Sequence, residues 1–319
     1  MFESTTPTQE QTPSSFETWL SLEVTKQYES QIRTLDRLGL LQILPESGRY
    51  GILDISGVER PLPEREDIKQ EMLKKRDFYC KKWEQGFTKL QITPFGLPLS
   101  TLIERAKQTI LKRHAAGVLF QTKKNQDDLS EALVPVDLDP NNPIYVWEGL
   151  DGADEKETLV YDPKQFTSEG HGGRTKKQIL NEQETGPFSG FLVSFYEPSV
   201  NIPRQGKGQT VGGRKQLETN QTPKEYLKQR EGDVMYQGEA GERPEEWLTR
   251  MMTHLAETDQ IIDDWQGNGS ANFLIGSWVP ASGGVPCAYF NRDNRRAYLA
   301  GDDPESRSGS SGCRSAVRV

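Results

Sequence analysis

Residues 279–319 read VPASGGVPCAYFNRDNRRAYLAGDDPESRSGSSGCRSAVRV. This stretch contains no Lys, Met, Gln or Trp, its only Glu is Glu305, and all six of its basic residues are Arg. Average residue usage predicts roughly eight residues of the missing types in a window of this length. The stretch is too rich in Gly, Ser, Asp and Asn for a packed helix, yet strand-like pieces, GSWVPA and CRSAVRV, bound it. It therefore predicts an ordered frame that holds a polar display surface dotted with aromatic residues.

The composition of the chain limits the classes of protein that it can belong to. The chain has 319 residues, 34% hydrophobic content and a net charge of −8, which indicate a soluble, loop-rich protein and disfavour general nucleic-acid binding. No apolar run approaches the ~20 residues of a membrane helix. The N-terminal MFESTTPTQEQTPSS lacks the features of a signal peptide. Three Cys without CxxC spacing disfavour a zinc ribbon or disulfide scaffold, so we expect a cytoplasmic location.

The first half of the chain predicts a mixed module of helices and short strands. Apolar residues recur at helical spacing in 15–41 and 99–114, a polar helix is expected over 64–83, and strands are expected in 49–57 and 87–100. His114 lies at a basic helix end, where exposure or an interaction with the helix dipole is expected and catalysis is not. The polar run TKKNQDDLSE marks a boundary. We therefore predict a disordered tail over 1–15, an N-terminal module over 16–130 and a second domain over 131–319.

The second half predicts strands, two helices and long loops. Alternating apolar and aromatic residues indicate strands in 142–150, 157–163, 190–200 and 271–278. A short helix is expected within 167–184. Thr222 and Glu225 form the pattern of a capping box with Pro223 at the first helical position. The strongest helical pattern covers 243–265, and Gly267 and Gly269 are expected to end it.

Three groups of residues are candidates for a phosphate or metal site. The segment IPRQGKGQTVGGRKQ (202–216) has glycines among basic residues, but it lacks the phosphate-binding Gly-Lys-Ser/Thr pattern, so a basic surface loop is preferred. His254 adjoins the apolar face of the 243–265 helix and has no second His or Cys at metal spacing, so a packed histidine is favoured. Three acids are interpreted as solvated rather than as a cation site: Asp259, Asp263 and Asp264.

The cysteines offer no case for nucleophilic catalysis. Cys287 and Cys313 lie 26 residues apart, and no His follows His254 to serve as a base. Small packed residues in a frame explain both. No Ser-His-Asp order or pair of catalytic carboxylates stands out, so the sequence gives no positive case for an enzyme.

Residues 140–319 resemble the variable proteins of bacterial diversity-generating retroelements. The resemblance rests on PEEWLTRMMTHLAET, GNGSANFLIGSW and the terminal block from PASGG to the last residue, with support from HGGRTKKQIL and IPRQGKGQTVGGRKQLETNQTPKEYL. FTKLQITPFGLPLSTLIERA accompanies this subtype. The resemblance implies an α+β chain whose second domain has a C-type-lectin-like fold, related to formylglycine-generating enzymes, with small twisted antiparallel sheets, two helices and long loops.

The resemblance also implies a mechanism of diversification. In that family a reverse transcriptase copies a template repeat with errors at adenines, so template Asn codons become NNC or NNT. Such codons cannot encode Lys, Met, Gln, Glu or Trp, which accounts for the composition of 279–319. Trp278 and Glu305 are then expected to belong to the frame. The residues that such codons can encode, and that we predict to bind ligand, are Tyr289, Asn291, Asp293, Asn294, Tyr298, Ala300, Gly301, Asp302, Ser306, Arg307, Ser308, Gly309, Ser310 and Ser311.

The family pattern assigns other terminal residues to the frame. These are Gly283, Gly284, Pro286, Arg292, Arg295, Ala297, Pro304, Gly312, Arg314 and Arg318. Cys287, Phe290 and Asp303 stay ambiguous. A lectin-like frame closes its first and last strands together, so we expect NPIYVWEGL to pair with CRSAVRV. The frame arginines are expected to hold loop carbonyls or acids beneath the display surface.

The sequence lacks residues that two related classes of protein need for their functions. Glu197-Pro198-Ser199 lacks the Trp-Asn-Asp that accompanies calcium-dependent sugar binding, and the chain lacks the closely spaced Cys pair of formylglycine-generating enzymes. We expect a non-enzymatic, hypervariable protein with no cofactor and no metal, which binds a protein or other macromolecule and does not itself bind nucleic acid or membrane. The alternatives are an oxidase of the formylglycine-generating type and a fixed lectin-like adaptor.

Overall fold

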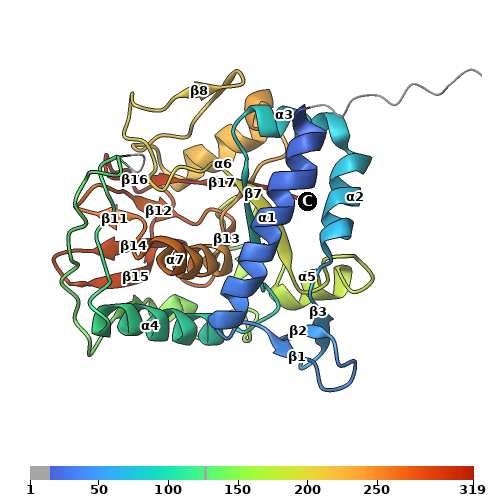
Figure 1. Cartoon of the computed structure of the whole chain (residues 1–319). Helices are drawn as coiled ribbons and strands as arrows, with labels where there is room; N and C mark the ends of the chain where they lie inside the picture. Colours follow the sequence, from blue (N-terminus) through green and yellow to red (C-terminus); the bar gives the residue numbers. More distant parts are fainter. Residues whose placement is uncertain (1–14, 126–127) are drawn as a thin grey trace, which may run out of the picture.

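The computed structural model describes residues 15–125 and 128–319, and within them the chain forms a mixed α+β fold (Figure 1). The predicted tail, 1–15, falls almost wholly outside these residues. The helix expected over 64–83 breaks at Lys75 into two. Seven α-helices lie in the described part of the chain: α1 (Ser15–Arg37), α2 (Arg65–Lys74), α3 (Arg76–Glu84), α4 (Leu99–Ala115), α5 (Lys176–Glu182), α6 (Pro223–Gly232) and α7 (Pro244–Thr258).

A four-stranded antiparallel sheet occupies the centre of the molecule. Its strand order is β10-β17-β7-β4. Every strand has neighbours far away in sequence, so the sheet ties both ends of the chain together. Its strands are β4 (Lys89–Thr93), β7 (Leu192–Tyr196), β10 (Ala240–Gly241) and β17 (Ser315–Arg318).

A second, six-stranded sheet contains most of the terminal stretch. Its order is β16-β12-β14-β15-β5, and β11 pairs with β14 beside β12. The β14–β15 hairpin is its longest pairing, and β5, β11 and β16 join in parallel. The strands are β5 (Ile144–Val146), β11 (Asp264–Trp265), β12 (Ala271–Phe273), β14 (Val285–Asn291), β15 (Arg296–Asp302) and β16 (Ser311–Cys313).

The remaining strands form small units at the periphery. One three-stranded antiparallel sheet follows α1, and two short ribbons lie in the second half. Their strands are β1 (Gln42–Ile43), β2 (Tyr50–Leu53), β3 (Glu59–Pro61), β6 (Val160–Tyr161), β8 (Thr210–Val211), β9 (Arg214–Lys215) and β13 (Ser277–Trp278). Short 3-10 turns cover Glu148–Leu150 and Val234–Tyr236.

The expected pairing of NPIYVWEGL with CRSAVRV is wrong. β5 pairs in parallel with β15, placing Tyr145 opposite Tyr298. The last strand, β17, pairs with β7 on one side and β10 on the other. Both edges of β17 are therefore already hydrogen-bonded, and β5 extends the other sheet.

The long helix of the second half is shorter than expected. The capping box of α6 at Thr222 is confirmed. Pro244 opens α7, but the helix ends at Thr258 and not at Gly267, because Asp259 adopts a left-handed conformation (φ 61°) as its C-terminal cap. The residues after it then pass along the sheet, where Asp264 begins β11.

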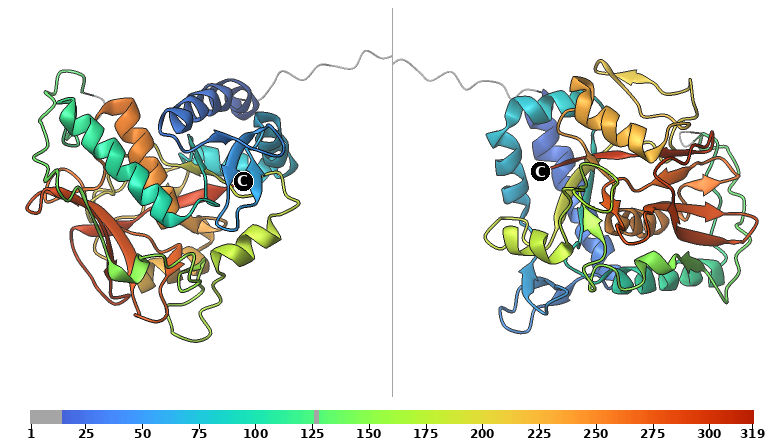
Figure 2. Two further views of the ribbon diagram at one scale, coloured as in Figure 1. Left: turned by 90° about the horizontal axis from the view of Figure 1, so that it is seen from below. Right: turned by 180° about the vertical axis from the view of Figure 1, so that it is seen from behind.

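The predicted boundary near residue 130 does not separate two packing units. β4 of the N-terminal part pairs along its whole length with β7 of the C-terminal part. One hydrophobic core contains Phe16 of α1, Trp247 of α7 and Val317 of β17. Figure 2 shows α4 beside α7, so N-terminal helices cover the helix that underlies the six-stranded sheet. The N-terminal part is thus built into the frame.

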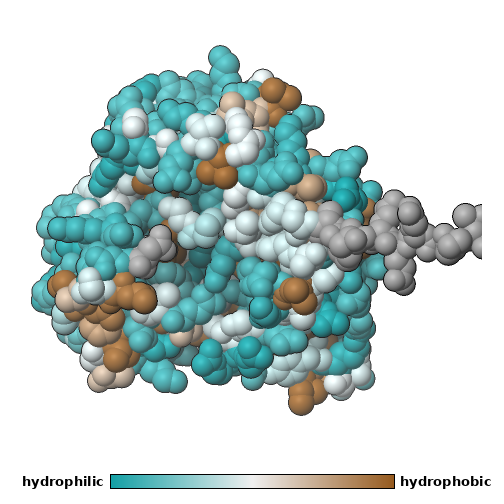
Figure 3. Space-filling model, turned by 45° about the horizontal axis from the view of Figure 1, so that its top comes forward, coloured by the Kyte–Doolittle hydropathy of each residue, from teal (hydrophilic) through white to brown (hydrophobic). Residues whose placement is uncertain are grey.

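Two apolar clusters lie on opposite faces of the six-stranded sheet. The main core holds Phe290 and Leu299 on the face toward α7. A smaller cluster on the other face joins Cys287 and Phe273 to Tyr226 of α6. The face of the molecule drawn in Figure 3 is largely hydrophilic with small apolar patches, and no helix among the described residues is long and apolar enough to cross a membrane.

Candidate ligand-display surface

Strand alternation in the β14–β15 hairpin separates two sets of side chains. Ala288 and Phe290 of β14 are buried toward the main core, whereas Tyr289 between them is half-buried on the opposite face. Along β15, Ala297 and Leu299 are buried while Tyr298 is half-buried. Successive side chains of a strand point to opposite faces, so the hairpin turns one row inward and the other outward.

The outward row forms an aromatic ladder across the sheet, defined here as Tyr145, Tyr298, Tyr289 and Trp265. Tyr289 lies directly opposite Tyr298, and Tyr298 directly opposite Tyr145. The rings of Tyr289 and Tyr298 are stacked, with centroids 5.2 Å apart and planes 10° apart. Tyr145 lies 4.9 Å from Tyr298, and Trp265 lies 5.3 Å from Tyr289. Four rings from four strands thus form one continuous surface.

The terminal loop before β16 continues the ladder with hydroxyl groups. Trp265 donates from Nε1 to Ser310 Oγ at 3.0 Å, and Ser310 Oγ lies 2.9 Å from Ser308 Oγ. Gly309 O accepts hydrogen bonds from Thr219 and Arg204. The loop is therefore held by elements outside the terminal stretch, although its sequence resembles a flexible linker.

Polar side chains also border the ladder. Asn294 donates from Nδ2 to the Tyr298 hydroxyl at 2.7 Å, and Arg296 lies 5.2 Å from the centroid of the same ring. Asp293 accepts a hydrogen bond from Gln266. Burial raises the pKa of the Tyr289 hydroxyl, so this phenol stays protonated and can donate or accept at neutral pH.

Most of the predicted ligand-binding residues are at least partly exposed. Among the fourteen, only Asn291 and Ser311 are buried. Asn291 Oδ1 accepts from the backbone N–H of Asn294, which closes the β14–β15 turn. These two residues serve the frame. The others are at least partly exposed: Tyr289, Asp293, Asn294, Tyr298, Ala300, Gly301, Asp302, Ser306, Arg307, Ser308, Gly309 and Ser310.

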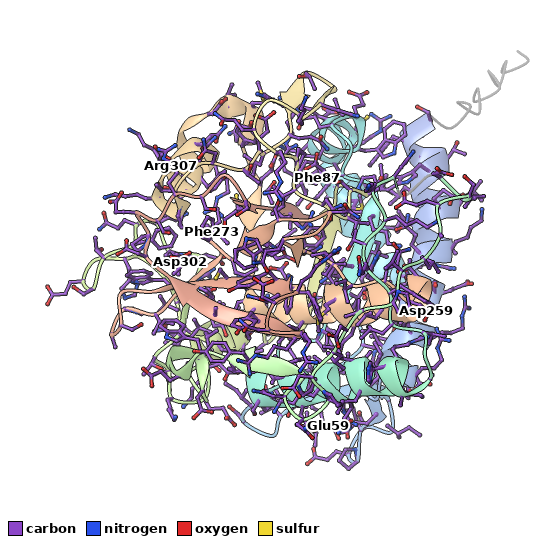
Figure 4. The ribbon with its side chains drawn as sticks, turned by 90° about the vertical axis from the view of Figure 1, so that its left-hand side faces the viewer. Glu59, Phe87, Asp259, Phe273, Asp302 and Arg307 are labelled. Carbon is purple, nitrogen blue, oxygen red and sulfur yellow. The ribbon has the colours of Figure 1, made fainter. Side chains whose placement is uncertain are left out.

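The codon rule allows exchange at all of these exposed positions, but contacts with the rest of the chain restrict which side chains fit at two of them. A Cβ at Gly301 would lie 2.5 Å from the Trp147 ring, so any side chain there requires the ring to move. Arg307 donates to Asn220 O at 2.7 Å and pairs with Glu225 of α6. Gly309, by contrast, has open space around its Cα. In Figure 4, Asp302, Phe273 and Arg307 lie in the same part of the molecule, with Arg307 nearest its edge.

The frame arginines bind acids and carbonyls beneath the surface. Arg292 pairs with buried Asp264 of β11. Arg314 pairs with buried Asp263 and donates to Val200 O. Arg318 pairs with buried Glu246, and Arg295 differs from the others because its partner Asp137 is exposed. Three of the four expected anchors are thus buried or half-buried ion pairs.

The structure also shows the surroundings of the glycines assigned to the frame and of the three residues that were assigned to neither set. A Cβ at Gly284 would lie 2.4 Å from the Trp147 ring, and one at Gly312 would lie 2.7 Å from Ile202. Cys287 and Phe290 are buried, whereas Asp303 is exposed. Trp278 is buried, and Glu305 pairs with Lys224 of α6.

Sequence reasoning missed three aromatic residues that precede the terminal block. Tyr145 and Trp265 form the two ends of the ladder, and Trp147 closes over Gly284 and Gly301. Tyr145 lies in β5 opposite Tyr298, whereas Trp147 lies just beyond the end of β5 and packs against the main core. The sequence did not reveal which strand β5 would join.

The two buried cysteines do not form a reactive pair. Cys287 and Cys313 both flank Phe273, one on each neighbouring strand, so a whole strand separates them. Burial raises the pKa of each thiol, which keeps both protonated. This arrangement offers neither a disulfide nor a thiolate nucleophile.

The other sites considered from sequence are occupied by internal contacts. In the glycine-rich segment, Glu218 accepts hydrogen bonds from the backbone N–H of Gly206 and Gly208, so a carboxylate of the chain fills the position that a phosphate would take. The expectation that the three acids are solvated is wrong for Asp263 and Asp264, which are fully buried counter-ions of arginines. No group of three His, Cys, Asp or Glu side chains suited to a metal occurs in residues 15–125 and 128–319.

Comparison of the chain with protein-family models, curated proteins and solved structures found no match.

Proposed function

We propose that this chain is a non-enzymatic ligand-binding protein whose outer sheet face is diversified by adenine-directed retroelement mutagenesis. The frame is proposed to be of the C-type-lectin type. The ligand is a protein or other macromolecule, because the ladder and its polar border form an open surface and not an enclosed pocket. Such surfaces suit broad contacts between macromolecules.

The observation that carries the proposal is the registered tyrosine stack. Tyr289 and Tyr298 are both residues that NNC or NNT codons can encode, and they face each other across the hairpin. Tyr145 and Trp265 lie outside the diversified block and support them from both sides. Tyr rings supply large contact area with little loss of conformational freedom and Ser supplies adaptable hydrogen bonds, which is why both are frequent in antibody binding sites.

Support also comes from the separation of exchangeable and fixed residues. The codon rule allows Tyr298 to be exchanged and the family pattern assigns Ala297 to the frame, and their side chains fall on opposite faces of β15. A binding site that changes without refolding needs such a separation, because inward residues are close-packed. The fixed ion pairs of Arg292 and Arg314 hold the strands from beneath.

The proposal is tested by sequencing the DNA downstream of the gene. We expect a near-copy of the last ~120 bases and a reverse-transcriptase gene, with mismatches only at template adenines (about three bases for each residue of the terminal stretch). Absence of the repeat, or mismatches at other bases, would contradict diversification. Identical tails in sister strains would favour a fixed lectin-like adaptor instead.

A further inference from the structure

Three ionisable side chains meet in a fully buried cluster outside the terminal stretch. Lys176 opens α5, Asp154 lies in the turn before β6, and Glu245 lies in the first turn of α7. Lys176 Nζ lies 2.6 Å from Asp154 Oδ2 and 2.9 Å from Glu245 Oε1, and all three side chains are 0% exposed. The proposed display function uses none of them, so the cluster is an independent feature of the fold.

Aromatic rings and a backbone carbonyl enclose the cluster. Lys176 Nζ lies 5.2 Å from the centroid of the Phe95 ring, and it donates to Leu97 O at 2.9 Å. The Tyr161 hydroxyl donates to Glu245 Oε1 at 2.6 Å. Phe95 and Tyr161 are themselves buried. The nitrogen is therefore held in one position, in surroundings that bulk water does not reach.

The cluster contains two carboxyl groups for one amine. With all three groups ionised it would carry one excess negative charge, and the nearby Arg243 does not balance this charge because it pairs with Asp162. Burial strongly opposes an unpaired charge. Uptake of one proton removes the excess and leaves one carboxyl group neutral. A neutral carboxylic acid is an electrophile for an amine, whereas a carboxylate is not.

Lys176 is the nucleophile of the cluster. Burial opposes its charged form, but Glu245 and Asp154 outweigh burial and raise the pKa of the ammonium. The amine therefore reacts only after a proton has moved from it to a carboxylate. Glu245 already contacts this nitrogen, so the transfer needs no solvent molecule.

We propose that Lys176 and Asp154 condense to form an intramolecular amide cross-link, an isopeptide bond, with Glu245 as the proton carrier. Glu245 first takes a proton from the ammonium, and the lone pair of Lys176 Nζ then attacks Cγ of protonated Asp154. A C–N bond forms, the nitrogen gives a second proton to Glu245, and Glu245 passes a proton to the departing hydroxyl. One C–O bond breaks and one water molecule leaves. Glu245 ends with the proton that the cluster had taken up, so no oxidant or cofactor is needed.

The two oxygens of Asp154 differ in a way that suits this reaction. Oδ2 accepts a hydrogen bond from the backbone N–H of Leu99 at 2.8 Å. A fixed N–H donor stabilises the negative charge that develops on an attacked carboxyl group, so Oδ2 is the oxygen that is kept. Oδ1 has no hydrogen-bond partner among the described residues, and it is the oxygen that leaves.

Burial and fixed geometry also favour the product. Two groups held in contact react as a single molecule, without the entropy cost of an encounter. Condensation replaces a buried ion pair, which has lost its hydration, by a neutral amide, and the water is released to solvent. The bond would join two segments that lie 22 residues apart in the chain.

Intact-mass spectrometry of the purified full chain, at once and after prolonged incubation at neutral pH, tests the proposal. We expect a mass lower than that of the sequence by one water molecule, at once or increasingly with time. Protease digestion should then give one branched peptide that joins the segments around Asp154 and Lys176. An unchanged mass after incubation would overturn the proposal. Loss of water with these two peptides still separate, as from a succinimide at Asp151-Gly152, would also overturn it.

Three variants assign the roles of the residues. Lys176→Arg keeps the positive charge but has no amine to form the bond, so its mass should equal that of its sequence. Asp154→Asn should form the same bond with loss of ammonia in place of water. Glu245→Gln removes the proton carrier and should slow the reaction about 100-fold, a typical effect of a general base. Reaction of Glu245→Gln at the parent rate would contradict the role of Glu245.

Lys82→Arg is the matched control. Lys82 is also buried and lies 2.8 Å from Glu239, but Arg214 binds both oxygens of that carboxylate. This variant should therefore lose one water molecule as the parent chain does. Loss of water that persists in Lys176→Arg, or that disappears in folded Lys82→Arg, would refute the assignment of the bond.

Discussion

The outer face of the β14–β15 hairpin and the ionic frame beneath it are built from the same short stretch of sequence, yet they follow opposite rules. On the outer face, Tyr289 and Tyr298 contact mainly each other and neighbouring rings. In the frame, Arg318 of the central sheet binds Glu246 of α7 and Asp162 after β6. Loss of an outer side chain removes a local contact, whereas loss of a frame arginine leaves buried charges without a partner.

The difference shows how a chain can change its surface and keep its fold. The frame stabilises the terminal strands through residues far away in sequence, such as Glu246 of α7 and Asp162 after β6. The outer face is supported by Tyr145 and Trp265, which lie outside the proposed diversified block. The ion pairs of Arg318 do not involve any of the exchangeable positions.

The largest effect is expected from Arg318→Leu. Arg318 donates to Glu246 at 2.7 Å and Asp162 at 2.8 Å, and Glu246 is fully buried. Breaking a buried pair by removing one partner typically costs about 3–5 kcal/mol, because an uncompensated charge remains. Urea unfolding at pH 7 measures this loss. A loss below about 1 kcal/mol would contradict the role of the ionic frame.

The loss of stability caused by Arg318→Leu should depend on pH. Burial opposes ionisation of Asp162 and Glu246, but Arg243 and Arg318 outweigh it and lower the pKa of both carboxyls. Groups with lowered pKa stabilise the fold above their unfolded pKa values, about 4, and lose this contribution as pH falls toward their folded values. The difference in the free energy of unfolding between Arg318→Leu and the parent chain should therefore decrease from pH 7 to pH 3.5. A difference independent of pH would argue against ion pairing.

A smaller effect distinguishes two glycines that the codon arithmetic treats alike. Gly301→Ala places a methyl group 2.5 Å from the Trp147 ring, whereas Gly309→Ala enters open space. Overpacking of this kind costs about 1–3 kcal/mol, so Gly301→Ala should lower the free energy of unfolding by that amount and Gly309→Ala by clearly less. Thermal melts of the two variants provide a matched comparison. Equal losses would mean that Trp147 does not constrain the surface.

The smallest effect on stability is expected from Tyr298→Ser, in the centre of the ladder. Its ring contacts Tyr289 and Tyr145, and aromatic pairs contribute about 0.5–1.5 kcal/mol each. We expect a loss of roughly 1–2 kcal/mol, below that of Arg318→Leu, together with loss of binding to any macromolecule captured by the parent chain. Chemical denaturation and a pull-down of that partner measure the two effects. Retained binding would exclude the ladder as the contact surface.

Local patterns predicted much of this fold because they depend on neighbouring residues. The capping box of Thr222 and Glu225 fixes the start of α6. The alternation of side chains along a strand places Tyr298 and Ala297 on opposite faces of the sheet. The pairing of β17 with β7 was not predictable in this way. Strand partners distant in sequence are chosen by the packing of the whole sheet, and a strand pattern is equally compatible with many partners.

Part of the candidate site could likewise be predicted from local information. Codon arithmetic found Tyr289 and Ser310 without a structure, since it depends only on residue identity. It placed Asn291 in the binding set, although the turn of the hairpin buries that side chain. It also could not find Trp265, which reaches the surface only because β11 pairs in parallel with β14.

The central claim is that outward residues of the hairpin can be exchanged while inward ones cannot, and two matched libraries test it most directly. One library carries NNC codons at Tyr289, Tyr298, Ala300 and Asp302, and the other carries them at Ala288, Phe290, Ala297 and Leu299. The measurement is the fraction of folded members, determined by protease resistance and sequencing. We expect most members of the outward library to fold and very few members of the inward library to do so. Similar fractions in the two libraries would contradict it.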